Sequence, residues 1–480
     1  MTNWKILFAG VLVMASAGCG DDAACVDGAC TGTGGASTGT GGATQGSGGA
    51  TSAGGNGGGG TCQATPENCV TPADEDCDGE TPACTGTEEW VTFLQGTGEF
   101  TALRAQPDGS VLALFQHSAG LVVAGDTLGS FGSVVLSLTP QGDVAWYFDC
   151  PSCGANDLAR LPDGRVVFGG QLYGDATATL GIAGPGGFVI VLSATGQKLA
   201  GVGYSASAQV SVDAIEATAS GFVMAGRNGS ANGLTIGSTS LAAHTDFLAE
   251  LDPTLTSGWV TTYGDAQNSA TIYDLDVRGS DGAIAMVGEI ETAGTGVDFG
   301  GGPIMVAAVA TFDATGAYQA QTELDSTPYA AVWTGPDLLV LGQAVAPPGS
   351  AAGLGLYSFD ASLTLGAQSI YALQNQLQWQ KQRQPLALDP FGNVIYGGNP
   401  TKLADGSPFS GRAVFVGKLA PDLAYVWQRA FMGDQMQSPD TYVVDAAASS
   451  IFIAGNAASG TVFDTATSGN AAPFIARLAP

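Results

Sequence analysis

An acidic cluster beside a cysteine has the residue types of a metal site. Asp74, Asp76 and Asp78 occupy positions 1, 3 and 5 of a short loop, and Gly79 follows at position 6. Alternation places three carboxylates on the inside of one tight turn, and glycine permits the bend that calcium loops require. Hard carboxylate oxygens favour Ca²⁺ over softer metals. Because Thr85 stands where such loops carry a closing glutamate, two readings stay open: an incomplete or differently closed Ca²⁺ site, or an acidic turn held only by disulfides.

The nine cysteines suit an oxidising compartment. Their number is odd, but an even set of eight remains once Cys19 is set aside for a different role. The eight disulfide candidates are Cys25, Cys30, Cys62, Cys69, Cys77, Cys84, Cys150 and Cys153. Half of them lie in the 62–84 segment, which is too short for a hydrophobic core and needs disulfides, metal or both. Its four cysteines allow three connectivities, and the sequence does not choose among them.

Residues 1–18 have the features of an export signal. Lys5 precedes an apolar run at 6–15 that is too short to span a bilayer, and small residues at 16–18 precede Cys19. This Ser-Ala-Gly-Cys sequence resembles the lipobox of bacterial lipoproteins. The resemblance implies cleavage before Cys19, acylation of its thiol and, since Gly20 follows, sorting to the outer membrane. An ordinary secretory signal with an incidental cysteine is the alternative.

A low-complexity segment separates this signal from the rest of the chain. Residues 31–61 are almost entirely Gly, Ser, Thr and Ala without charge, so they cannot build a core. As a flexible coil they would span about 30 Å. We therefore expect residues 19–61 to be a lipid-anchored linker and 62–84 a compact Cys-rich knot. The knot also resembles short Cys-rich DxDCDG segments of extracellular Gram-negative proteins, which implies metal binding.

Tryptophans recur at a regular interval in the remaining chain. Trp90, Trp146, Trp259 and Trp427 are separated by 56, 113 and 168 residues, close to one, two and three times one unit. A repeat of this size is typical of propellers and solenoids, and residues 85–480 hold about seven such units. With 73 glycines and only 12% charged residues, the composition favours turn-rich β-structure over long helices.

Each unit contains two recognisable apolar strands. One ends near an acidic or proline turn, as at 188–192 and 474–478, and the other ends in glycine, as at 166–170. The strand with tryptophan that follows the first kind is missing after residue 478, whereas residues 90–93 supply one. Because a propeller must cover its open edge, we expect residues 90–93 to close the ring as the outer strand of the last blade.

The units resemble the SBBP-type β-propeller repeat of bacterial surface and secreted proteins. The similarity is carried by WVTTYG at 259–264, an acidic strand at 274–277, IAMVG at 284–288 and FDATG at 312–316. The resemblance implies a propeller fold for roughly residues 88–480. It implies no biochemical role, because a fold does not fix a function.

The sequence gives little sign of nucleic-acid binding, histidine-based catalysis or a redox CxxC centre. A net charge of −29 repels phosphate backbones, so nucleic acid is not expected as a partner. The two histidines, His117 and His244, belong to different units and accompany no nucleophile motif, which favours structural or surface roles. Cys150 and Cys153 have CxxC spacing, but no second CxxC and no following helix accompany them. We expect them to form a structural disulfide in a loop on the outer side of a blade, away from the central channel.

These patterns together predict an all-β, seven-bladed propeller at 85–480. We expect a monomeric, non-enzymatic outer-membrane lipoprotein that contacts the membrane through its lipid anchor and binds a glycan or a protein with its propeller. One alternative is a polysaccharide-acting enzyme that uses a pair of carboxylates in the central funnel. The other is a passive structural component of the envelope.

Overall fold

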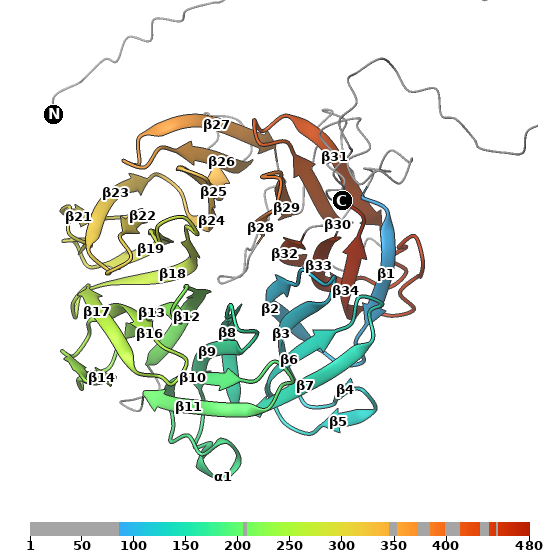
Figure 1. Cartoon of the computed structure of the whole chain (residues 1–480), viewed down its shortest axis with the longest axis horizontal. Helices are drawn as coiled ribbons and strands as arrows, with labels where there is room; N and C mark the ends of the chain where they lie inside the picture. Colours follow the sequence, from blue (N-terminus) through green and yellow to red (C-terminus); the bar gives the residue numbers. More distant parts are fainter. Residues whose placement is uncertain are drawn as a thin grey trace, which may run out of the picture. The chain divides into compact units, whose positions relative to one another are not determined.

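The structure, a computed structural model, describes residues 86–204, 209–344, 353–372, 385–398, 413–432, 441–447 and 450–480. They form seven four-stranded antiparallel sheets that stand as blades around a common axis (Figure 1). The prediction of an all-β, seven-bladed propeller is confirmed. The predicted signal, linker, lipidation site at Cys19, acidic loop at Asp74, Asp76 and Asp78, and all cysteines before residue 85 lie outside the described residues.

The strands of each blade follow one another from the axis outward. Blade 1 contains β2 (Gly98–Ala105), β3 (Val111–His117), β6 (Gly132–Leu138) and β7 (Val144–Pro151). Blade 2 contains β8 (Cys153–Arg160), β9 (Val166–Leu172), β10 (Gly186–Leu192) and β11 (Lys198–Tyr204). Blade 3 contains β12 (Val210–Ala217), β13 (Phe222–Asn228), β16 (Asp246–Leu251) and β17 (Ser257–Tyr263). Blade 4 contains β18 (Asn268–Val277), β19 (Ile284–Thr292), β22 (Ala307–Phe312) and β23 (Tyr318–Leu324).

The remaining blades repeat this order. Blade 5 contains β24 (Pro328–Thr334), β25 (Asp337–Ala344), β26 (Gly353–Phe359) and β27 (Leu365–Ala372). Blade 6 contains β28 (Leu386–Leu388), β29 (Val394–Gly398), β30 (Ala413–Leu419) and β31 (Tyr425–Met432). Blade 7 contains β32 (Thr441–Ala447), β33 (Ser450–Ala457), β34 (Ala472–Leu478) and, as its outer strand, β1 (Glu88–Phe93).

The pairing of β1 with β34 closes the ring. The two strands are antiparallel, with Trp90 opposite Arg477 and Phe93 opposite Phe474. The first described strand of the chain therefore lies beside the last one (Figure 1). This confirms the predicted closure, and it satisfies a sheet edge that would otherwise be open.

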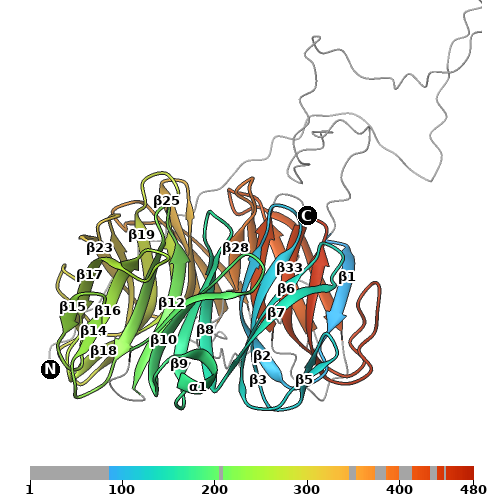
Figure 2. The same ribbon diagram turned by 60° about the horizontal axis from the view of Figure 1, so that its bottom comes forward.

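The topology gives the propeller two different ends. Tight turns join first to second and third to fourth strands at one end, which we call the hairpin face. The opposite end, the pocket face, carries the blade-to-blade connections and the loops between second and third strands. These loops contain the ribbons β4 (Leu121–Val123) with β5 (Asp126–Leu128), β14 (Leu234–Ile236) with β15 (Thr239–Leu241) and β20 (Val297–Asp298) with β21 (Pro303–Ile304), and helix α1 (Thr177–Leu180). Figure 2 shows α1 and β5 at the same edge of the molecule.

The regularly spaced tryptophans join each outer strand to the next blade. The indole N–H groups of Trp90, Trp259 and Trp427 donate to Pro140 O at 2.8 Å, Ala314 O at 3.1 Å and Pro480 O at 2.7 Å. Each acceptor lies just after the third strand of the following blade. The turn glycine Gly316 has φ 76°, and a Cβ there would lie 2.4 Å from the Trp259 ring, so the turn needs glycine both for its conformation and for this contact. The tryptophan period thus reflects one kind of contact between blades, which recurs in blades 3, 6 and 7.

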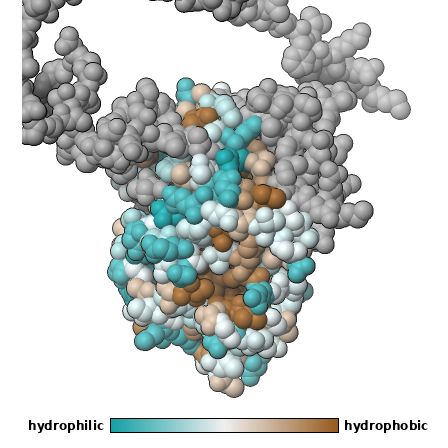
Figure 3. All heavy atoms as spheres, turned by 90° about the vertical axis from the view of Figure 1, so that its right-hand side faces the viewer, coloured by the Kyte–Doolittle hydropathy of each residue, from teal (hydrophilic) through white to brown (hydrophobic). Residues whose placement is uncertain are grey.

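The hydrophobic core is divided into clusters between neighbouring blades. One of them joins Leu114 of blade 1 to Phe168 of blade 2 and includes both Cys150 and Cys153, which form a disulfide. Cys153 begins the innermost strand of blade 2, and both sulfur-bearing residues are fully buried. The expected position on the outer side of a blade holds for Cys150, on the outer strand β7, but is wrong for Cys153, because the connection from β7 is a single residue that leads to the innermost strand β8. Figure 3 shows a mixed outer wall, with hydrophobic side chains in a band among hydrophilic ones.

Candidate functional site

A β-bulge interrupts the first strand of most blades. The pairing between first and second strands shifts register at one residue in blades 1 to 5 and in blade 7. A bulge redirects a side chain from its normal face. Two bulge residues reach the next blade: Thr101 Oγ1 donates to Ala155 O at 3.2 Å, and Asn156 Nδ2 donates to Val212 O at 2.8 Å. The bulges therefore direct polar side chains across the blade interfaces.

Four aspartates that follow these bulges also contact the next blade. We call Asp157, Asp274, Asp276 and Asp445 the inner-strand acids. Their Oδ2 atoms accept backbone N–H groups of Ile215 at 2.8 Å, Ala331 at 2.9 Å, Trp333 at 2.6 Å and Ala105 at 2.7 Å, respectively. In Asp157, Asp276 and Asp445 the second oxygen accepts the N–H of the next residue in the chain. These carboxylates thus cross-link neighbouring first strands.

Arg104 provides the positive charge among these acids. Its Nη2 lies 3.4 Å from Asp157 Oδ1 and 3.1 Å from Glu216 Oε2, so one guanidinium joins blades 1, 2 and 3. Burial lowers the pKa of Arg104, but the carboxylates of Glu216, Asp157 and Asp445 together raise it by more. The guanidinium therefore stays charged.

Burial raises the pKa of the inner-strand acids. Desolvation is the largest cause in each, and the pKa values reach about 6 for Asp157, about 7 for Asp276 and about 6 for Asp445. A carboxyl group with a raised pKa meets the electrostatic requirement for a general acid. However, backbone N–H groups of two strands already occupy the oxygens of these three residues. The geometry consequently favours a structural role over the funnel acid pair of the enzyme alternative.

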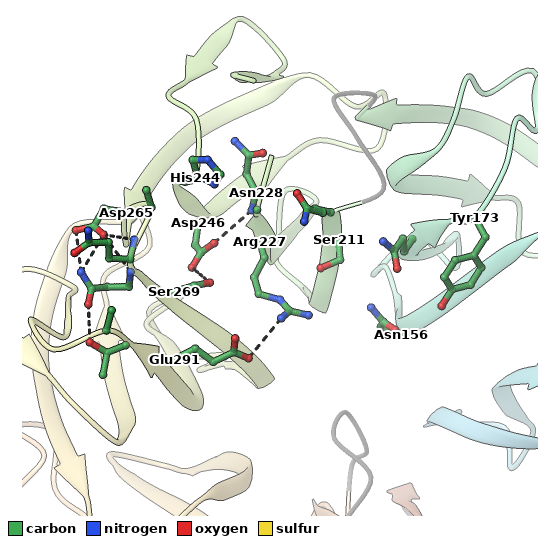
Figure 4. A pocket seen from close by; sticks show the side chains of 18 residues that line it. Asn156, Tyr173, Ser211, Arg227, Asn228, His244, Asp246, Asp265, Ser269 and Glu291 are labelled. Atoms are coloured by element: carbon green, nitrogen blue, oxygen red, sulfur yellow. Dashed lines mark hydrogen bonds and ion pairs between the residues drawn. The ribbon is translucent and has the colours of Figure 1, made fainter. Parts of the chain in front are cut away.

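A pocket of about 850 Å³ opens on the pocket face at blades 2, 3 and 4 (Figure 4). Its wall is formed by the ends of second strands, the starts of first strands with the loops that precede them, and, in blade 3, the start of the third strand β16 with the loop before it. The lining is rich in amides, hydroxyls and carboxylates: Asn156, Gln171, Gln209, Ser211, Asn228, Gln267, Asn268, Ser269, Asp246, Asp265, Glu291 and Thr292, with Tyr173, Arg227 and His244. Its size is within the range of roughly 300–1,000 Å³ typical of small-molecule sites.

Arg227, at the end of β13, lies at the centre of the pocket's charged groups. Its Nε donates to Asp213 Oδ2 at 3.0 Å, its Nη1 donates to Thr271 Oγ1 at 3.1 Å, and Glu291 Oε1 is 3.9 Å from Nη1. Asp213 is completely buried, and desolvation raises its pKa despite the guanidinium. Arg227 itself is 31% exposed. One side of the guanidinium is thus anchored in the protein while the group stays accessible to solvent.

Asp246 forms part of the pocket floor between blades 3 and 4. Its Oδ2 accepts Ser269 Oγ–H at 2.8 Å and the N–H of Ala270 at 2.8 Å, and its Oδ1 accepts the N–H of Asn228 at 3.3 Å. Burial raises the pKa of Asp246 to about 6. Glu291, in contrast, has a side chain that is 58% exposed. The floor of the pocket therefore consists of groups that are hydrogen-bonded within the protein, whereas polar groups at its rim are exposed to solvent.

The structure separates the two histidines that the sequence singled out. His117 is buried in blade 1, with Nε2 3.4 Å from Asp149 Oδ1. His244 lies in the pocket wall, where its backbone has φ 56° and its N–H donates to Ser230 O at 3.1 Å. Sequence reasoning did not find the pocket, because its residues come from the ends of strands in three different units. The one available signal was a concentration of Asn, Gln and Asp near the starts of first strands.

No family model matches the chain, and no curated protein matches it, so the SBBP resemblance stays a prediction. Solved propellers are similar in architecture. The propeller domain of Swd1 from Myceliophteria thermophila is 11% identical, with 76% of this chain and 96% of that chain covered and a TM-score of 0.43. BamB from Moraxella catarrhalis is 12% identical, with 81% and 100% covered and a TM-score of 0.41. The propeller of the Trilobed protease from Pyrococcus furiosus is 7% identical, with 80% and 94% covered and a TM-score of 0.42.

Two features are absent from the described part of the chain. No helix there is long and apolar enough to cross a membrane. Within the same ranges, no three His, Cys, Asp or Glu side chains are grouped so as to hold a metal ion. The acidic loop at Asp74, Asp76 and Asp78 is not among these residues, so the Ca²⁺ prediction is unaffected.

Proposed function

We propose that this chain is a cell-envelope lipoprotein whose propeller binds a glycan in the pocket on its pocket face. The observation that carries the proposal is the polar lining of a concave site with exposed groups at its rim. Amides, hydroxyls and carboxylates match the dense hydroxyl groups of a sugar, and a pocket of about 850 Å³ suits an oligosaccharide better than a flat protein surface.

The charge of the site narrows the glycan class. Asp265 and Glu291 are exposed at the pocket, and Arg227 already pairs with buried Asp213. The chain as a whole carries a net charge of −29. An acidic polysaccharide would therefore be repelled, and a neutral glycan is favoured. Because the inner-strand acids are bonded within the protein, we infer binding without hydrolysis.

Glycan binding is tested with the purified mature protein on an array of neutral and acidic glycans. We expect binding to neutral members, a loss of about tenfold or more in affinity for Glu291→Ala and an unchanged length of the bound glycan after incubation. Asp337→Ala, at the start of β25 on the hairpin face, is the control. Absence of binding to every glycan, or equal binding by the Glu291 variant, would reject the pocket as a glycan site.

Membrane attachment of the proposed lipoprotein rests on Cys19. Two or more acyl chains anchor a protein firmly, since each buried methylene contributes roughly 0.8 kcal/mol. We expect Cys19→Ser to abolish incorporation of labelled fatty acid and to release the protein from the membrane fraction. Unchanged partition into membranes would contradict lipid anchoring.

The acidic loop is proposed to hold Ca²⁺ between linker and propeller. Three carboxylates at Asp74, Asp76 and Asp78 repel one another unless a cation or the neighbouring disulfides offset that cost. Calorimetric titration of the mature protein should show one Ca²⁺ site that Asp76→Asn removes. Equal Ca²⁺ binding by both proteins, or none by either at millimolar Ca²⁺, would leave the loop as an acidic turn.

A further inference from the structure

Two aromatic side chains are exposed side by side near the pocket. Phe131 is 45% exposed and Tyr173 is 55% exposed, and their ring centroids are 5.5 Å apart with an interplanar angle of 58°. Phe131 immediately precedes β6 of blade 1, and Tyr173 immediately follows β9 of blade 2. Both therefore lie on the pocket face. Tyr173 also lines the pocket, on the same side as Asn156 (Figure 4).

Backbone hydrogen bonds to Ser152 hold Phe131 and Tyr173 in place. Ser152, between the two disulfide-bonded cysteines, donates its N–H to Phe131 O at 2.9 Å and accepts the N–H of Tyr173 at 3.0 Å. Ser152 has φ 63°, a left-handed conformation that lets one residue contact both neighbours. The Tyr173 ring lies over Gly154, where a Cβ would be 2.5 Å from the tyrosine hydroxyl oxygen. The backbones of Phe131 and Tyr173 are therefore held by hydrogen bonds to Ser152, which itself lies between two disulfide-bonded cysteines.

Solvent exposure of two paired aromatic rings indicates a binding role more than a packing role. Tyrosine presents an apolar ring with a polar tip, which suits a surface that is apolar on one side and hydrated on the other. The C–H groups on the face of a pyranose ring form such an apolar surface, while its hydroxyl groups point sideways. At Tyr173 the sideways groups would meet the amides and carboxylates of the adjoining pocket.

We propose that Phe131 and Tyr173 form a stacking subsite for one pyranose ring of a neutral glycan whose neighbouring sugar enters the pocket. This inference rests on the proposed glycan function and adds the residues that select a sugar ring over other polar ligands. A stacked base is disfavoured because the phosphates of a nucleic acid would meet the strongly negative chain.

The test compares matched tyrosines. Tyr425, on the outer strand of blade 6, is 51% exposed and does not line the pocket, so Tyr425→Ala removes a similarly exposed ring. The probes are neutral hexasaccharides of β-1,4-glucan, β-1,3-glucan, α-1,4-glucan and mannan, titrated calorimetrically into the mature protein. For the hexasaccharide that binds, we expect Tyr173→Ala and Phe131→Ala to raise Kd about tenfold, Tyr173→Phe to stay within about twofold, and Tyr425→Ala to leave Kd unchanged.

The outcomes separate the two proposals. Wild-type affinity in Tyr173→Ala, together with loss of affinity in Glu291→Ala, would overturn the stacking subsite and leave the glycan pocket standing. Failure of the wild-type protein to bind any neutral glycan would overturn both. A loss in Tyr425→Ala equal to that in Tyr173→Ala would place sugar binding outside this face and would also overturn the subsite. Thermal unfolding midpoints for each variant exclude misfolding as the cause of a lost signal.

Discussion

The inner strands and the pocket face use the same residue types in opposite ways. Among the inner strands, Asp157, Asp276 and Asp445 each accept N–H groups from two strands, and Arg104 lies between Asp157 and Glu216. At the pocket, the floor residue Asp246 accepts backbone N–H groups in the same way, and buried Asp213 behind the pocket accepts Arg227 Nε–H, but Arg227 is 31% and the Glu291 side chain is 58% exposed. Charged residues with raised pKa values are therefore not by themselves a functional site. What distinguishes the pocket is that polar groups remain accessible after the bonds within the protein are made.

The largest expected effect comes from replacing the arginine of each region, Arg104 among the inner strands and Arg227 at the pocket, by glutamine. Arg104→Gln leaves several buried carboxylates without their cation, and breaking a buried ion pair in this way costs about 3–5 kcal/mol. Arg227→Gln leaves one buried carboxylate, Asp213, and the exposed Glu291 without their cation, and water already reaches the 31%-exposed Arg227, so we expect about half that loss. Urea unfolding at pH 7.5 measures both. Equal losses would show that the Arg227 cluster is as structural as the inner strands.

Carboxylate removal is expected to have the next largest effect. Asp276→Ala leaves the N–H groups of Trp333 and Val277 without their acceptor, each at a cost of about 1–3 kcal/mol when buried. Asp276→Asn keeps one acceptor oxygen and should cost less. Glu291→Ala, at the pocket rim, should stay within about 0.5 kcal/mol of wild type in unfolding free energy. An Asp276→Ala protein as stable as wild type would remove the cross-linking role from the inner-strand acids.

The pH dependence of stability should be a smaller effect, but its direction can be predicted. Asp157, Asp276 and Asp445 have pKa values of about 6 to 7 in the folded protein, above the 3.8 of an ordinary aspartate. Between about pH 4 and pH 7 the folded state therefore binds more protons than the unfolded state, so stability falls as pH rises. We expect the unfolding midpoint to rise on acidification from pH 7.5 to pH 5, by the equivalent of about 1–3 kcal/mol per acid.

A control separates this effect from the general relief of negative charge. The triple variant Asp157→Asn, Asp276→Asn, Asp445→Asn keeps the surface charge and removes three of the buried carboxyl groups with raised pKa values, while Asp213, Asp246 and Asp274 remain. Its unfolding midpoint should change less between pH 7.5 and pH 5 than that of wild type. Identical pH profiles would show that Asp157, Asp276 and Asp445 do not set the dependence.

The repeat architecture followed from local sequence features. Trp90, Trp259 and Trp427 recur because each of these side chains contacts the chain just after the third strand of the next blade. Apolar alternation and turn glycines such as Gly316 define the strands from residues close in the chain. The closing strand was predicted by counting strands in each unit. The last unit lacked an outer strand, and residues 90–93 formed a strand that belonged to no complete unit.

The candidate site was not visible in this way. Its acids and amides do not recur in all units, so no period marks them. In six of the seven blades, a bulge shifts the side chains of the first strand by one residue, and this decided that Asp157 reaches Ile215 of the next blade. The pairing of Phe131 with Tyr173 depends likewise on Ser152, which binds the backbones of two blades at once.

The sequence by itself determined the all-β class, the seven units and the strand that closes the ring, because these depend on patterns within one unit or on counting units. Only the tertiary structure decided which polar residues are bonded within the protein and which face solvent. That distinction depends on contacts between blades. Asp274 and Asp276, for example, bind the N–H groups of residues 57 positions further along the chain, and a hydrogen bond forms only if the two atoms lie within a few tenths of an ångström of the right distance. Cys150 and Cys153 show the difference: their spacing indicated a disulfide, and only the fold placed it beneath the exposed aromatic pair.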